Sequence, residues 1–297
     1  MSREVSPTTG QAYGVERVCQ TLQLPRSTVY ARQSAGSVPK PAAAKRGPKP
    51  VVSAEALLDA IRADLATSPF QGEGHRKVWA RLKFGQGMRV SRKRVLRLMR
   101  EHHLLSPYRR PQGPPKAHDG TIGTDAPNVM WGTDATKVFT IEEGYGWVFV
   151  AVEHWNAECM GIHVCKTGNR MAALEPVAQG VRAQFGSVEC GAARGLALRM
   201  DHGSQYTSDH FVNQLHAWGI APSFAFVQEP ETNGVAERFI RTLKEQAIYG
   251  RTFRTLEALR RAIAAFVERY NHQWRLEKTG FRTPHEMRVQ RALSEAA

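Results

Sequence analysis

Two aspartates occupy places in the chain where a strand would normally carry an apolar side chain. Asp134 lies in the middle of the β-rich segment WGTDATKVF, and Asp201 ends the apolar segment GLALRM. A carboxylate within or at the end of a central strand is costly to bury unless a cation or a metal ion compensates its charge. The two positions therefore indicate a site for a divalent metal ion.

Glu237 is a third candidate, and it lies on a predicted helix between Pro230 and Gln246. Arg241 and Lys244 follow it at i+4 and i+7, so one side of the helix presents an acid and then two bases. The packing side carries Val235, Phe239, Leu243 and Ala247. The alternative interpretation is a surface ion pair between Glu237 and Arg241, worth only about 0.2–0.5 kcal/mol.

Loops flank both of the later carboxylates. Asp201 is followed by His202, which either orients a water or phosphate or caps the turn. The next residue, Gly203, allows the backbone to turn close to a bound phosphate or ion. Before the glutamate, the segment PETNG contains Asn233 and Gly234 and is expected to contact phosphate or to move when substrate enters.

The elements that must position these residues are predicted between residues 127 and 275. Three β-rich segments separated by Glu/Gly turns indicate an antiparallel meander. Alternating helices and strands follow, in the order NRMAALEPVAQGVRAQFG, GLALRMD, SDHFVNQLHAWG, IAPSFAFV, the helix of Glu237, and TLEALRRAIAAFVERYNHQ. This order predicts an α/β domain with a mixed sheet flanked by helices.

Residues 53–105 are predicted to form three short helices with Ser53 and Ser91 as N-caps. The last helix is basic, and its outward side chains include Arg92, Lys93, Arg94 and Arg97. A compact DNA-binding domain is the favoured interpretation, and a helical bundle with an idle positive face is the alternative.

Residues 1–35 are predicted to form a helix-turn-helix segment with its turn at Leu24-Pro25. The second helix would present Arg26, Ser27 and Thr28 to a DNA groove, although a structural helical hairpin fits the pattern equally well. Two linkers and a tail complete the predicted organisation: a basic linker at 36–52, a Pro/Gly-rich linker at 106–126, and a C-terminal tail at 276–297.

The positive charge of the chain is confined to its first part. Up to Ala126 there are 22 Lys and Arg against 9 Asp and Glu, and from Pro127 onward there are 19 against 18. This asymmetry is typical of a polyanion-binding arm joined to a domain with another task. No long apolar segment or signal peptide is apparent, and the four cysteines form neither a CxxC pair nor a zinc pattern, so a soluble, intracellular, reduced protein is expected.

Four segments resemble the DDE transposases of bacterial insertion sequences, specifically the orfB-type product of the IS-three family. They are WGTDATK, DHGSQYTSDHF, GIAPSFAFVQEPETNGVAERFIRTLKEQ and YNHQWRLEKTGFRTPHEM. The resemblance implies that residues 127–275 form an RNase H-like catalytic core of the retroviral integrase type with a five-stranded mixed sheet. It also implies that Asp134, Asp201 and Glu237 are the catalytic triad, and that Lys244 and Arg241 face the DNA.

The resemblance further implies a polynucleotidyl transferase that cleaves the 3′ ends of a mobile element and joins them to another strand. Two Mg²⁺ ions, for which Mn²⁺ is expected to substitute, suit a set of carboxylate ligands. Asp134 would bridge both ions, and Asp201 and Glu237 would each bind one. Many relatives carry Ser where this chain has Arg238, and their loop differs from PETNG, which bears on loop mobility and end preference but leaves the triad intact.

The partners implied are the element's terminal inverted repeats, target DNA, and at least one further copy of the chain, in the bacterial cytoplasm at the nucleoid and away from membranes. A small upstream helix-turn-helix protein, or a frameshift fusion with it, is a further implied partner. Two alternatives stay open on the sequence: a domesticated DNA-binding regulator that no longer cuts, and a metal-dependent nuclease on the same fold.

Overall fold

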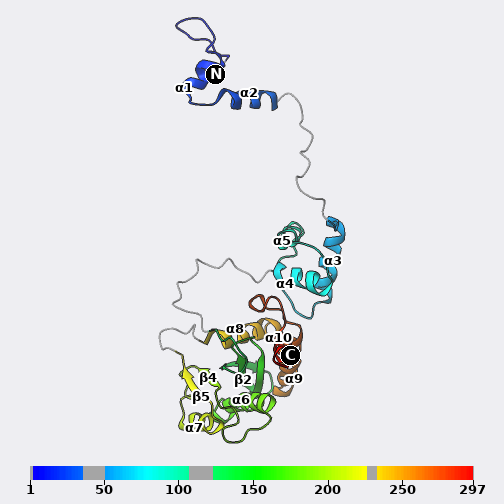
Figure 1. Cartoon of the computed structure of the whole chain (residues 1–297), viewed down its shortest axis with the longest axis vertical. Helices are drawn as coiled ribbons and strands as arrows, with labels where there is room; N and C mark the ends of the chain where they lie inside the picture. The colour runs from blue at the N-terminus through cyan, green and yellow to red at the C-terminus, as the bar shows by residue number, and fades with distance from the viewer. Residues whose placement is uncertain (1–2, 36–50, 107–122, 226–232, 297) are drawn as a thin grey trace. The chain divides into compact units, whose positions relative to one another are not determined.

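The computed structural model describes residues 3–35, 51–106, 123–225 and 233–296 (Figure 1). The chain divides into two units, Met1–Val51 and Val52–Ala297. In the first unit, α1 (Gly14–Thr21) and α2 (Arg26–Ala35) are joined at the predicted turn. Gln23 takes a left-handed conformation there, with φ of 51°, and the Leu24 N–H donates to the Cys19 carbonyl at 2.9 Å, which ends α1.

The second unit begins with three short helical stretches, as predicted. Ser53 and Ser91 are confirmed as N-caps, because their side chains accept hydrogen bonds from the backbone N–H groups of Ala56 and Arg94. The helices are α3 (Ala54–Thr67), α4 (His75–Ala80) continued by the π-helical turn η1 (Arg81–Gly85), and α5 (Arg92–Glu101). Their shared core consists of Leu57, Ile61, Val78, Leu82, Val95, Leu98 and Met99.

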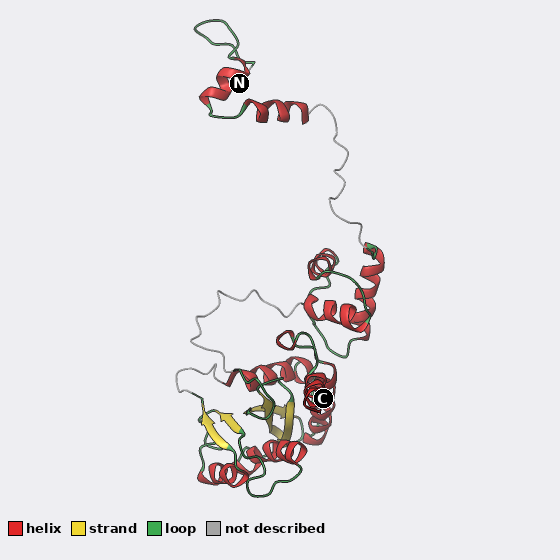
Figure 2. Cartoon of the chain, viewed as in Figure 1, coloured by secondary structure: helices red, strands yellow, loops and turns green. Residues whose placement is uncertain are grey.

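A five-stranded mixed sheet follows, with the strand order β3-β2-β1-β4-β5. Figure 2 shows its strands in yellow and the helices in red. The first three strands form the predicted antiparallel meander, and β4 and β5 extend it in parallel with β1. The strands are β1 (Met130–Thr140), β2 (Gly144–Glu153), β3 (Cys159–Cys165), β4 (Ala197–Met200) and β5 (Ala221–Phe224). This mixed five-stranded sheet confirms the predicted α/β class.

Helices cover both faces of the sheet, which explains why β2 is buried along nearly its whole length. Phe149 and Ala151 on β2 pack with α6 (Arg170–Phe185) and α7 (Asp209–Trp218) in one core. The alternate residues of β2 pack in a second core with three elements: α8 (Gly234–Leu243), the π-helical turn η3 (Lys244–Ile248), and α9 (Leu256–Gln273). The period-2 alternation of a strand thus divides one sheet between two cores.

The segment after residue 275, expected to be a tail, contains two further helices that belong to the core. They are the short 3-10 helix η4 (Glu277–Thr279) and α10 (Pro284–Ala296). Arg288 on α10 pairs with Glu158 and lies 3.8 Å from Glu153, and the buried Asn156 amide donates to the Pro284 carbonyl at 2.8 Å. These long-range polar contacts hold α10 against the sheet.

The loop between α3 and α4 enters the second core of the sheet domain. Phe70 is 5% exposed and belongs to that core, with its ring centroid 4.8 Å from that of Trp274. The Gln71 N–H donates to the Gln246 side chain, and the Gln246 amide donates back to the Gln71 carbonyl, each at 2.9 Å. The helical domain therefore contacts the sheet domain through specific packing. Among the helices of the described ranges, none has the length and apolar character required to span a membrane.

Candidate active site

Asp134 and Asp201 lie on neighbouring strands of the sheet. Asp134 is in the middle of β1, opposite Val150 of β2, and Asp201 directly follows the last residue of β4. The parallel register of β1 and β4 pairs Gly132 with Arg199, so the same register continued by two residues sets Asp134 opposite Asp201. The sheet thus brings together two carboxylates that are 67 positions apart in the sequence.

The Asp134 carboxyl has a raised pKa. Burial, together with the negative charges of Asp201 and Glu237, raises it to about 6. The backbone N–H of Ala135, which donates to Asp134 at 2.7 Å, and the positive charge of Lys244 act in the opposite direction. The three predicted carboxylates and the predicted lysine therefore lie within electrostatic reach of one another.

Glu237 is exposed on the first turn of α8, while the opposite side of that helix is packed against the sheet. The buried side chains of α8 are Ala236, Phe239, Ile240, Thr242 and Leu243. Lys244 is half-buried and begins η3, where the helix widens to π-type bonding. Such single π turns interrupt an α-helix at a cost, and they are frequent at functional sites.

The loop after Asp201 folds back on its carboxylate. The Gly203 N–H donates to Asp201 Oδ1 at 2.8 Å. A Cβ at position 203 would lie 2.9 Å from that oxygen and 2.6 Å from Gln205 Nε2, so a larger residue would displace the Asp201 or Gln205 side chain. His202 forms a 2.8 Å hydrogen bond between Nε2 and the Ala225 carbonyl, and its ring stacks on Phe224, which ties the loop to the end of β5.

Asn233 is placed differently from the expected phosphate-facing loop residue. It is 3% exposed, and its amide nitrogen donates to the carbonyl oxygen of Thr133 on β1 at 3.0 Å. It precedes α8 but makes no side-chain capping bond, and its Oδ1 has no hydrogen-bond partner among the described residues. Gly234, by contrast, begins α8 with open space around it. The remainder of the PETNG loop lies outside the described residues.

The donor set suits a hard divalent cation, because all three candidate ligands are carboxylates and Mg²⁺ prefers oxygen. Within the described residues, no group of three His, Cys, Asp or Glu side chains lies close enough to enclose a metal ion. Mg²⁺ usually keeps several waters and is bound by one or two carboxylates together with substrate phosphates. Asp134, Asp201 and Glu237 are therefore the residues that could hold it.

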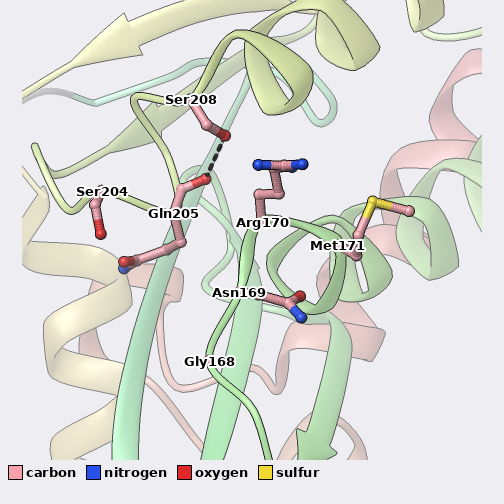
Figure 3. A pocket seen from close by; sticks show the side chains of 7 residues that line it. All are labelled: Gly168, Asn169, Arg170, Met171, Ser204, Gln205 and Ser208. Carbon is pink, nitrogen blue, oxygen red and sulfur yellow. Dashed lines mark hydrogen bonds between the residues drawn. The ribbon is translucent and has the colours of Figure 1, made fainter.

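A small polar pocket of about 360 Å³ lies beside the loop that follows Asp201. Figure 3 shows Asn169 and Arg170, at the start of α6, on one side of it, and Ser204, Gln205 and Ser208 on the other. The Ser208 hydroxyl donates to the Gln205 carbonyl at 3.2 Å instead of capping α7. The polar lining continues the site away from the carboxylates.

A larger groove of about 1430 Å³ runs along α8 and η3. Seven Lys and Arg residues and three Glu residues line it, so its surface is net positive. The sequence predicts Arg241 as a DNA contact in this groove and marks Arg238 as a difference from related proteins. Arg76, Lys77 and Arg251 carry no such signal, because α4 is too short to show a clear pattern and Arg251 lies in an irregular segment.

The other residues predicted to contact DNA differ in whether their side chains already pair with other residues of the chain. Arg241 is exposed and pairs with Glu245 at 2.9 Å. Arg92 pairs with Glu277 at 3.0 Å, and Arg94 donates to the Val52 carbonyl. Lys93 in α5 and Ser27 and Thr28 in α2 are exposed. Arg97 and Arg26 are also exposed, but Arg97 pairs with Glu101 at 3.5 Å and Arg26 pairs with Glu16 at 3.1 Å.

Comparison with known families matches these regions in turn. An HTH-like domain model matches residues 53–112, and two integrase core domain models match residues 124–230 and 218–284. The two integrase models together span more than half of the chain and include all three carboxylates. The chain belongs to the integrase-core transposases. A transposase with these two domains is a polynucleotidyl transferase that acts on DNA.

Individual relatives agree with this assignment. The transposase InsD for insertion element IS2 of Escherichia coli is 29% identical over 227 residues, which cover 74% of each chain. Two solved structures are similar to this transposase at lower identity. The catalytic core domain of BIV integrase is 21% identical with a TM-score of 0.42, and the match covers 57% of this chain and 99% of that one. The HTLV-2 integrase catalytic core in complex with magnesium is 17% identical with a TM-score of 0.36, covering 52% and 93%.

Proposed function

We propose that this transposase binds the terminal inverted repeats of a mobile element, cleaves their 3′ ends and transfers the resulting 3′ hydroxyl to another DNA strand. The observation that supports the proposal is that Asp201 and Glu237, from the end of a second strand and from a helix, and Lys244 all act electrostatically on Asp134. Carboxylates so arranged serve phosphoryl transfer through bound metal rather than through a covalent enzyme intermediate.

Two Mg²⁺ ions are the proposed cofactor, and Asp134, Asp201 and Glu237 are the residues that would hold them. When bound, they would activate the attacking oxygen and stabilise the charge on the leaving 3′ oxygen. The chain's own residues orient the reaction: β1 and β4 fix the two aspartates, and the Gly203 N–H holds the Asp201 carboxylate. Lys244 places a positive charge where a phosphate of the DNA end would approach the carboxylates.

The net positive groove along α8 is the proposed path of the DNA backbone toward these carboxylates. Lys93 and Arg97 on α5, together with Arg26, Ser27 and Thr28 on α2, are proposed as further contacts to the element's end. Two ends and a target require at least two copies of the chain, and a small upstream helix-turn-helix protein, or a fusion with it, is a proposed partner. The nucleoid is the proposed place of action.

The test is Mg²⁺-dependent cleavage and joining of a labelled duplex that carries the element's terminal repeat. Glu237→Gln should remove both products while DNA binding is retained, because it changes one ligand and little else. Glu245→Gln is the matched control, since it makes the same substitution on the next turns of the same helical stretch, where the residue pairs with Arg241. Binding without chemistry from the parent protein, even with the upstream protein added, would contradict the proposal and favour a DNA-binding regulator.

A further inference from the structure

The helix that carries Glu237 is attached to the strand that carries Asp134 at two points. Asn233, the residue before α8, donates its amide N–H to the Thr133 carbonyl at 3.0 Å. Ala236, on the first turn of α8, is fully buried. Thr133 directly precedes Asp134 and Ala236 directly precedes Glu237, so each attachment is one residue away from a carboxylate.

Gly132 makes this close approach of helix and strand possible. A Cβ at position 132 would lie 2.9 Å from Asn233 Oδ1, 3.1 Å from His154 Nε2 and 3.3 Å from the Ala236 Cβ. The first of these distances is shorter than real Cβ contacts allow, and the other two are tight. A larger residue at 132 would therefore displace the Asn233 side chain from its place beside β1 and press against His154 and Ala236.

Burying Asn233 at this position does not serve the stability of the fold in the usual way. An Asn before a helix normally accepts a hydrogen bond from the first turn, but this one makes no capping bond. Its Oδ1 is buried without a hydrogen-bond partner among the described residues, which is destabilising. What the side chain does provide is one directed hydrogen bond to the backbone beside Asp134.

We propose that Asn233 is a positioning residue, which together with Gly132 fixes the separation between the Glu237 and Asp134 carboxylates and thereby the affinity of the site for its divalent cation. The inference rests on the proposed function, since it assumes that these carboxylates bind the ion. Partners that orient metal ligands without touching the ion typically change metal affinity by about 10–100-fold when they are replaced.

The experiment titrates Mn²⁺ into the full chain and follows free Mn²⁺ by electron paramagnetic resonance. Asn233→Leu keeps the side chain's approximate volume but removes the donor, and it should weaken Mn²⁺ binding by about 10-fold or more. Gly132→Ala should weaken it similarly. In DNA cleavage, both variants should lower kcat while leaving the KM for DNA unchanged, because the DNA surface is not altered.

Asn271→Leu is the matched control. Asn271 on α9 also clamps a helix to a strand, because its amide donates to the Cys159 carbonyl and its carbonyl accepts from the Cys159 N–H, each at 3.0 Å. That clamp lies on β3, away from the carboxylates, so its loss should lower the Tm without changing Mn²⁺ affinity more than twofold. If Asn233→Leu does not fold, Asn233→Ala provides the same comparison with a smaller side chain.

Three outcomes separate the possibilities. Weakened Mn²⁺ binding in the Asn233 and Gly132 variants, with Asn271→Leu unchanged, supports the positioning role. A folded Asn233→Leu protein with the parent's Mn²⁺ affinity, or an equal loss in Asn271→Leu, overturns it while leaving the proposed function intact. Equal Mn²⁺ affinity of the parent and Glu237→Gln would show that the carboxylates do not hold the ion, which overturns the proposed function and this inference together.

Discussion

Asp134 and Glu237 belong to one site but are held by different kinds of bonding. Asp134 sits in a strand that is paired with β2 on one side and, through its first residues, with β4 on the other. Glu237 is exposed on a helix that reaches the same strand through side-chain packing and the single hydrogen bond of Asn233. A backbone ladder fixes the first carboxylate, whereas complementary side chains fix the second. The aspartate should therefore tolerate displacement less than the glutamate does.

The largest expected effect comes from changing the length of each ligand. Asp134→Glu should reduce Mg²⁺-dependent cleavage on the order of 10³-fold, because a ladder on both sides prevents β1 from retreating to accommodate the longer side chain. Glu237→Asp should cost roughly tenfold less, since the first turns of α8 can shift toward the ion. Single-turnover cleavage rates at saturating DNA measure both. A Glu237→Asp loss as large as that of Asp134→Glu would show that the helix is as rigidly held as the strand.

Substitutions that create a cavity beneath α8 or α7 should distinguish a loss of stability from a loss of metal binding. Leu243 at the end of α8 and Leu215 on α7 are both fully buried, in the cores on opposite faces of the sheet. Replacing either by Ala should lower the free energy of unfolding by about 2–5 kcal/mol. Only Leu243→Ala should also weaken Mn²⁺ binding, because it loosens the element that carries Glu237. Urea unfolding and Mn²⁺ titration test this, and an equal effect on Mn²⁺ binding from Leu215→Ala would contradict it.

The two cations that follow Glu237 should differ in their contribution to DNA binding. Lys244 acts electrostatically on Asp134, whereas Arg241 is exposed and already paired with Glu245. Lys244→Met should weaken binding of the terminal-repeat duplex and reduce the slope of log Kd against log salt by about one, as expected for one lost phosphate contact. Arg241→Met should change the slope less. Fluorescence anisotropy across a salt series measures both, and equal slopes for the two variants would count against the distinction.

The smallest effect expected is a pH dependence of stability in the presence of a chelator. Because burial raises the pKa of Asp134 to about 6, above its ordinary value of 3.8, the folded state binds this proton more tightly than the unfolded state does. Its contribution to the free energy of unfolding therefore increases as pH falls from about 6 to about 4. Asp134→Asn should be more stable than the parent at pH 7, and the difference should shrink toward pH 4. A difference that is constant with pH would mean that the carboxyl titrates normally.

Much of this arrangement follows from local sequence patterns. The period-2 segments, the apolar stripes of the helices and the serines before α3 and α5 predict the elements correctly, because strand alternation and capping are decided within a few residues. The position of Asp201 at the end of β4 follows in the same way. That Asp134, Asp201 and Glu237 should meet came from a resemblance to a family, since their separations carry little information by themselves.

What the sequence did not predict depends on contacts between distant residues. Asn233 belongs to a Pro/Asn/Gly segment typical of an exposed turn, and only the missing side chain of Gly132, about a hundred positions earlier, creates room for it against β1. Arg288 similarly makes the last helix resemble a charged tail. Its partner Glu158 lies between β2 and β3, 130 positions earlier in the sequence. Such pairings are settled by packing, which leaves no local signal.

The insertion of Phe70 into the sheet domain bears on how this protein can be divided. A truncated protein that begins after the helical domain would lack Phe70 and the Gln71 partner of Gln246, and would expose the ring of Trp274 and its surroundings to water. Such newly exposed apolar surfaces promote self-association. The helical domain thus covers an apolar surface of the catalytic domain. Isolating the catalytic domain without self-association should require a polar replacement for Trp274 or the retention of residues from Val52 onward.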